Sequence, residues 1–120
     1  MKQIADWALN VATLRGATYA DARLVDDRSR ALATKNGRVG NASDSESLGI
    51  GVRVIANGAW GFAASDNLSR QAIEETASRA VAVAKASAQV KQQDVRLAPE
   101  KPVTAEWTTP HEIDPFTISV

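Results

Sequence analysis

An Asn-Gly pair at 57–58, between the apolar runs 48–56 and 59–65, constrains the fold of this chain more than any other feature. Asn-Gly between two such runs is the strongest short-range signal of a two-residue β-hairpin turn. A turn at these residues also fixes the strand register, because Ile55 then lies opposite Trp60. Since side chains alternate along a strand, the residues on each face of the hairpin follow directly.

The two faces of the predicted hairpin differ in bulk. One face combines aliphatic residues of the first strand with small residues of the second: Leu48, Ile50, Val52 and Val54 with Ala59, Gly61 and Ala63. The other face carries Arg53 and Ile55 beside Trp60 and Phe62. Both faces are apolar enough to need a covering layer. We expect a helix on the first face, because small residues there let another backbone approach closely.

Helical spacing of apolar residues is found on both sides of the strand-rich region. The first helix is expected from Lys2 to Arg15, ended by Gly16. The second is expected from about Ser69 to Ala88, with Ser69 as its N-cap. The inward stripe of the second helix is mostly alanine: Ile73, Ala77, Ala80, Val81, Ala84 and Ala88. Such a helix can lie close to a sheet but buries little area per residue.

Five strands are predicted between the two helices. They are expected at 19–25, 31–35, 38–42 and on both sides of the 57–58 turn. Polar turns at 26–29 and 43–46, and a second Asn-Gly pair at 36–37, separate them. The order α-β-β-β-β-β-α predicts an α+β fold, in which an antiparallel sheet, a meander of hairpins, carries two helices on one face.

The chain changes character after Gln89. Four prolines indicate extended, irregular chain there: Pro99, Pro102, Pro110 and Pro115. A short strand is expected only near Val103–Trp107. We therefore predict one α+β domain over residues 1–90. Residues 91–120 are predicted to form a Pro-rich extended linker.

Composition excludes several classes of function. The chain has 14 basic and 14 acidic residues and a formal net charge of zero, which argues against nucleic-acid binding through phosphate neutralisation. No cysteine is present, so disulfides and thiolate chemistry are excluded. The lack of disulfides is consistent with a reducing compartment. No apolar run approaches membrane-spanning length. We expect a cytoplasmic protein that binds neither nucleic acid nor membrane.

Three patterns resemble functional motifs, and each has a simpler interpretation. His111-Glu112 lacks the second histidine that a helical H-E-x-x-H zinc site needs, and proline lies on both sides of it. The glycines of 49–51 lie inside a strand pattern and indicate a bulge or a close backbone approach. Asp26-Asp27, Asp44 and Glu46 lie in predicted turns, where aspartate bonds its own backbone. We predict no catalytic, metal-binding or cofactor-binding residue in this chain.

The bulky face of the hairpin is the main functional candidate. The candidate interface residues are Arg53, Ile55, Trp60, Phe62 and Trp107. Tryptophan, phenylalanine and arginine are typical interface anchors, and an arginine can stack on an aromatic ring. Two interpretations remain open: a second core layer beneath the Pro-rich tail, with Trp107 packing there, and a docking surface for a missing domain or a partner subunit.

The segment 49–65, GIGVRVIANGAWGFAAS, resembles the signature of the N-terminal domain of the TldD/PmbA family. These are the TldD-type peptidases, also called modulators of DNA gyrase. Further similarities are Tyr19–Arg23, Asn36–Arg38, Ala72–Ala88, Trp107–Pro110 and Asp114–Phe116. The last two favour the TldD-like branch. The resemblance covers nearly the whole chain and is specific as an ordered set.

The resemblance implies an N-terminal domain of a TldD-like zinc metallopeptidase that hydrolyses peptides. In the family the histidine-glutamate zinc motif lies in the C-terminal domain, and none of its residues maps onto this sequence. The segment would then be non-catalytic and would serve architecture and assembly. Its partners would be the parent's C-terminal domain and a family subunit, in a homo- or hetero-oligomer. A stand-alone binding module and a PmbA-like non-catalytic partner subunit are the alternatives.

Overall fold

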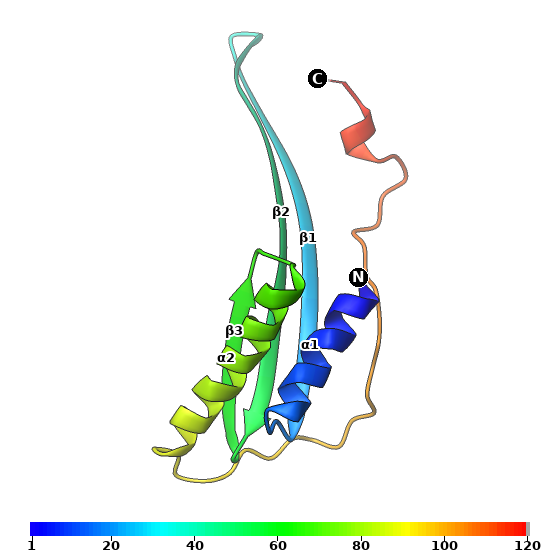
Figure 1. The fold of residues 1–120 in the computed structure, drawn as a ribbon. Helices are drawn as coiled ribbons and strands as arrows, with labels where there is room; N and C mark the ends of the chain where they lie inside the picture. Colours follow the sequence, from blue (N-terminus) through cyan, green and yellow to red (C-terminus); the bar gives the residue numbers. More distant parts are fainter. Residues whose placement is uncertain (120) are drawn as a thin grey trace. The chain divides into compact units, whose positions relative to one another are not determined.

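A computed structural model describes residues 1–119 (Figure 1). Its elements are α1 (Lys2–Leu14), β1 (Tyr19–Lys35), β2 (Arg38–Ala56), β3 (Ala59–Ser65), α2 (Arg70–Ala88) and a short 3-10 helix, η1 (Pro115–Thr117). The three strands form one antiparallel sheet in the order β1-β2-β3. The predicted α+β fold class, with two helices and an antiparallel sheet, is confirmed.

The chain forms two compact units. One unit comprises Met1–Ser29 and Ser45–Arg96, and it holds both helices, β3 and the hydrophobic core. The other comprises Arg30–Asp44, which we call the ribbon, and the chain from Leu97 onward. The domain boundary that we placed near residue 90 stays a prediction.

The β2–β3 hairpin has the predicted turn and register. Asn57 and Gly58 have φ values of 53° and 77°, the left-handed pair that a type I′ turn requires. Ile55 pairs with Trp60 and Val54 with Gly61. The assignment of residues to the two faces is therefore confirmed.

The strands β1 and β2 are longer than predicted, and the expectation of five strands is wrong. The sequence indicated turns at 26–29 and 43–46, but both segments lie inside continuous strands. Charged side chains there form ion pairs: Arg28 Nε lies 3.0 Å from Glu46 Oε1. Because residues 25–48 are exposed, polar residues stay solvated without leaving the strand. The polar runs therefore marked solvent-facing strand rather than turns.

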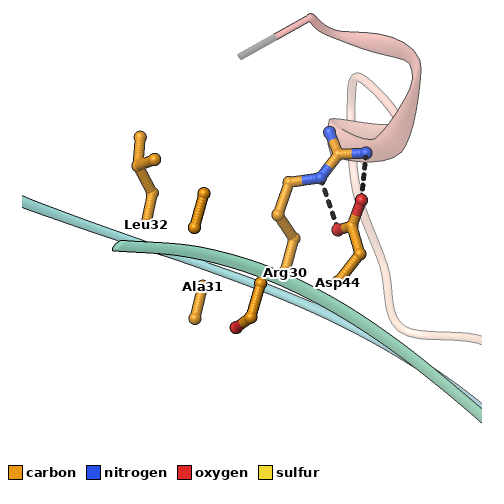
Figure 2. A pocket seen from close by; sticks show the side chains of 6 residues that line it. Arg30, Ala31, Leu32 and Asp44 are labelled. Atoms are coloured by element: carbon orange, nitrogen blue, oxygen red, sulfur yellow. Dashed lines mark hydrogen bonds and ion pairs between the residues drawn. The ribbon is translucent and has the colours of Figure 1, made fainter. Parts of the chain in front are cut away.

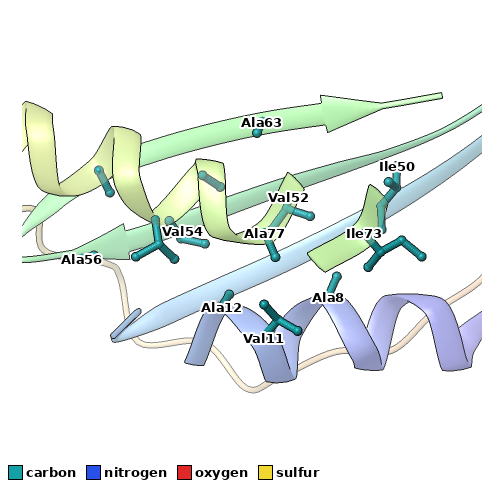
Figure 3. Packing of buried hydrophobic residues seen from close by; sticks show 13 residues of the cluster. Ala8, Val11, Ala12, Ile50, Val52, Val54, Ala56, Ala63, Ile73 and Ala77 are labelled. Carbon is teal, nitrogen blue, oxygen red and sulfur yellow. The ribbon is translucent and has the colours of Figure 1, made fainter. Parts of the chain in front are cut away.

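Both helices pack on the aliphatic face of the hairpin, as predicted. Ile50, Val52 and Val54 of β2 are buried there with residues of both helices (Figure 3). The helix residues of this core include Ala8, Val11 and Ala12 of α1 and Ile73, Ala77, Ala80, Val81 and Ala84 of α2. Leu48, which we expected on this covered face, is 39% exposed, and Ala88 is only half-buried.

The helix α2 lies directly against β3 at Gly61. A Cβ atom added to Gly61 would lie 2.0 Å from the carbonyl oxygen of Ala80 and 2.6 Å from the backbone nitrogen of Ala84. Only glycine permits this approach. The helix begins as predicted, because the Ser69 hydroxyl accepts a hydrogen bond from the Ala72 N–H at 3.2 Å.

The chain after α2 is irregular, as the prolines indicate. Between Ala88 and Pro115 the structure has no helix or strand, so the short strand expected at Val103–Trp107 is not formed. One backbone bond, from Val95 N–H to the Gly58 carbonyl at 2.9 Å, ties the start of this segment to the hairpin turn. Within residues 1–119, no helix is long and apolar enough to cross a membrane.

Candidate interface

A group of polar and aromatic side chains lies on the sheet face opposite the helices. Strand alternation places Arg53, Trp60 and Phe62 there, because their neighbours Val54 and Gly61 face the core. Tyr19 and Asp21 of β1 contact this group. We call the five residues Tyr19, Asp21, Arg53, Trp60 and Phe62 the aromatic surface.

Arg53 is held in place from two sides. Its guanidinium carbon lies 4.8 Å from the centroid of the Trp60 ring, a cation–π distance. Its Nε and Nη2 donate to the same carboxylate oxygen of Asp21, at 3.0 and 2.8 Å. The hydrogen bond and the charge of Asp21 raise the pKa of Arg53. The stacking expected from the sequence is present, and the ion pair leaves the surface close to neutral.

Tyr19 completes the group from β1. Its hydroxyl donates to Asp21 Oδ2 at 2.9 Å, and its ring meets Trp60 in a T-shaped contact with centroids 6.0 Å apart. The hydrogen bond to Asp21 stabilises the protonated phenol and raises the pKa of Tyr19, and burial adds to this. Tyr19 and Asp21 were not predicted to belong to the surface. Tyr19 and Asp21 are two residues apart, so a strand places them on the same face, and this spacing was visible in the sequence. The register between β1 and β2, which brings them to Arg53, was not visible there.

The aromatic surface is open to solvent in this chain. Phe62 is 60% exposed and Trp60 36%. A shallow groove of about 420 Å³ runs beside them, lined also by Gly61 and by Val83 of α2. Ile55 is only 5% exposed, so it lies beneath the surface rather than on it. Trp107 is 80% exposed on the irregular segment, and its place in an interface stays a prediction.

The structure also describes the other sequence candidates. Gly51 lies in β2, where an added Cβ would approach the Phe62 ring to 3.1 Å, which is the close approach expected. Nδ1 of His111 lies 3.0 Å from the Thr109 carbonyl oxygen. Across residues 1–119, no three His, Cys, Asp or Glu side chains come together in a way that could hold a metal ion.

Comparison with known proteins agrees with the resemblance seen in the sequence. A family model described as PmbA/TldA metallopeptidase domain 1 matches residues 20–84. The chain belongs to this family. The match spans the sheet and most of α2, so it includes the aromatic surface apart from Tyr19. Whether the chain lies in the TldD-like branch stays a prediction.

Relatives of this PmbA/TldA domain carry consistent descriptions. A metalloprotease of Methanocaldococcus jannaschii is 26% identical over 102 residues, covering 85% of this chain and 23% of that protein. A metalloprotease of Methanothermobacter thermautotrophicus is 36% identical over 52 residues, covering 43% of this chain and 12% of that protein.

One solved structure shows that the fold is shared. The crystal structure of a candidate modulator of DNA gyrase from Bacteroides thetaiotaomicron matches with a TM-score of 0.67 at 17% identity, over 88% of this chain and 24% of that one. This PmbA/TldA domain thus spans less than a quarter of the length of each relative.

Proposed function

We propose that this chain is the non-catalytic N-terminal domain of a zinc metallopeptidase, and that it serves the architecture and assembly of the parent protein. The family match and the two metalloprotease relatives support the peptidase assignment. The observation that carries the assembly role is the aromatic surface, an exposed Trp-Phe-Arg group on the sheet face opposite the helices.

We propose that the remainder of the parent chain covers the aromatic surface. The Methanocaldococcus relative is about four times as long as the matched segment, since that segment covers 23% of it. Arg53 is already neutralised by Asp21 and fixed on Trp60, so burying the group leaves no unpaired charge and orders few side chains. Both properties favour a stable interface. In this proposal the parent protein also pairs with a second family subunit.

Zinc chemistry belongs, in this proposal, to the C-terminal domain of a cytoplasmic parent protein. The described residues supply no ligand set, so we assign no step of peptide hydrolysis to them. The parent reading frame distinguishes this proposal from a stand-alone binding module or a PmbA-like partner subunit. A downstream histidine-glutamate zinc motif supports a TldD-like peptidase.

The isolated 120-residue chain is expected to bind no catalytic zinc and to cleave no peptide. The physical reason is its single histidine and its lack of cysteine, which leave no clustered nitrogen or sulfur ligands. Metal analysis of the purified chain and a broad peptide-cleavage assay test this, with the complete parent protein as the positive control. Stoichiometric zinc together with chelator-sensitive turnover would contradict the proposal.

In the complete parent protein, Trp60→Ala is expected to separate this domain from the rest of the chain. Truncating a buried tryptophan anchor costs an interface about 2 kcal/mol or more. Differential scanning calorimetry should then show two transitions where the wild type shows one. Sedimentation velocity on the same samples reports any loss of subunit pairing.

Two further variants make the Trp60 experiment specific. Phe62→Ala should act in the same direction, and it leaves the stacking of Arg53 and Tyr19 on Trp60 intact. Leu14→Ala removes an exposed apolar side chain at the end of α1, 78% exposed, and should leave the single transition unchanged. If Trp60→Ala lowers the stability of the isolated chain as much as that of the parent, Trp60 is only a core residue.

A further inference from the structure

The last described segment of the chain contacts the ribbon at Arg30. After Arg96 the chain has no regular structure until the one-turn helix η1. Asp114 caps this turn, accepting the Phe116 N–H at 3.0 Å, and the Phe116 side chain is half-buried. Arg30 of the ribbon reaches this turn, so the contact lies wholly within the second compact unit.

The Arg30 guanidinium makes three kinds of contact, and Figure 2 shows the one with Asp44. Nε and Nη2 donate to the two carboxylate oxygens of Asp44, at 2.7 and 3.3 Å. Nη1 donates to the Ile118 carbonyl at 3.0 Å. The guanidinium carbon lies 5.5 Å from the centroid of the Phe116 ring. Asp44 thus orients the guanidinium of Arg30 across the two strands. The remaining donor, Nη1, and the face of the guanidinium hold the segment.

Only arginine can make this set of contacts. The planar fork offers donors in fixed directions and a face that stacks on an aromatic ring, whereas lysine is a flexible point charge. Ion pairs and cation–π contacts at exposed sites are individually weak, and the Arg30 side chain is 28% exposed. A contact of this kind holds a segment reversibly rather than permanently.

We propose that Arg30 is a releasable latch that fastens the segment Asp114–Ile118 to the ribbon. When the latch is closed, residues 114–118 are held against the ribbon. When it opens, residues 97–118 become a tether that can extend up to about 70 Å. In the parent protein, the latch then limits how far the following domain can move from this one. This step rests on the proposed function.

The test uses the 120-residue chain, which is free of cysteine, with a nitroxide label attached through Ser119→Cys. We expect Arg30→Lys to increase the mobility of the label and to speed amide hydrogen exchange in 114–118 about tenfold, because hydrogen bonds to a charged group are lost. Asp44→Asn should act in the same direction. Salt at 1 M should move the wild type toward the variant, since exposed charges are then screened.

The matched control is Arg38→Lys, the same substitution elsewhere in the ribbon, which should leave both signals unchanged. Far-UV circular dichroism and thermal melting check that each variant is folded. Unchanged label mobility and exchange in a folded Arg30→Lys chain would overturn the latch, as would an equal effect of Arg38→Lys. The experiment does not involve the aromatic surface, so the latch and the proposed function can fail independently.

Discussion

Replacing Gly61 with alanine is expected to destabilise the domain severely. The new methyl group would lie 2.0 Å from the Ala80 carbonyl oxygen and 2.6 Å from the Ala84 nitrogen. Both are backbone atoms of α2, so no side chain can rotate away, and the helix must move off the sheet. We expect a loss of about 3 kcal/mol, which lowers the melting temperature of a domain of this size by about 12–24 °C. Thermal melting followed by circular dichroism measures it.

Gly40→Ala is the matched control for Gly61. Gly40 also lies in a strand, and its added Cβ would meet only the Ala33 carbonyl oxygen at an ordinary 3.8 Å. We expect no loss of stability, and a gain of up to about 1 kcal/mol, because alanine lowers the entropy of the unfolded chain. Equal melting temperatures for the Gly61→Ala and wild-type chains would show that α2 does not lie on β3 as described.

The second large effect is expected from Ala80→Phe. Ala80 is fully buried, and its neighbours across the seam are the small residues of β3, so a phenylalanine ring finds no space. Overpacking of this kind costs on the order of 1–3 kcal/mol. Urea denaturation at constant temperature gives the change directly, as a lower midpoint at an unchanged slope.

Ala82→Phe separates crowding from helix propensity. Ala82 is exposed on the same helix, and phenylalanine lowers helix propensity by about 0.5 kcal/mol at either position. The difference between the two variants therefore reports the seam alone. If both variants shift the urea midpoint by the same amount, the alanine stripe of α2 does not face β3.

Local signals in the sequence were sufficient for the core of this fold. The pair Asn57-Gly58 fixed a turn, and the turn fixed which residues of β2 and β3 face the helices. The Ser69 cap and the alanine spacing placed α2 within one residue of its start. Each of these signals acts between residues that are close along the chain, where turn and cap chemistry is specific.

Contacts between distant residues were not predictable in the same way. Tyr19 and Asp21 meet Arg53 only because β1 pairs with β2 in one register, and the exposed faces of these strands carry no hydrophobic alternation to reveal it. For the same reason Asp44 was interpreted as a turn residue rather than the partner of Arg30. Arg53, Trp60 and Phe62 were predicted for the surface, and their partners on β1, Tyr19 and Asp21, were not.

The close packing of α2 on β3 also limits which strands can be added at the edge of the sheet. β3 is an edge strand whose sequence, AWGFAAS, has no charge and no proline, although these are usual guards against aggregation. A second copy that joined its own β3 there would bring its α2 to about 4.8 Å from the first, one strand spacing. Packed helices need about 8–10 Å between axes. The helix above the strand therefore opposes an antiparallel pairing of two copies at this edge, in which both helices would lie on the same face of the sheet, and its bulk acts where other sheets use charged residues.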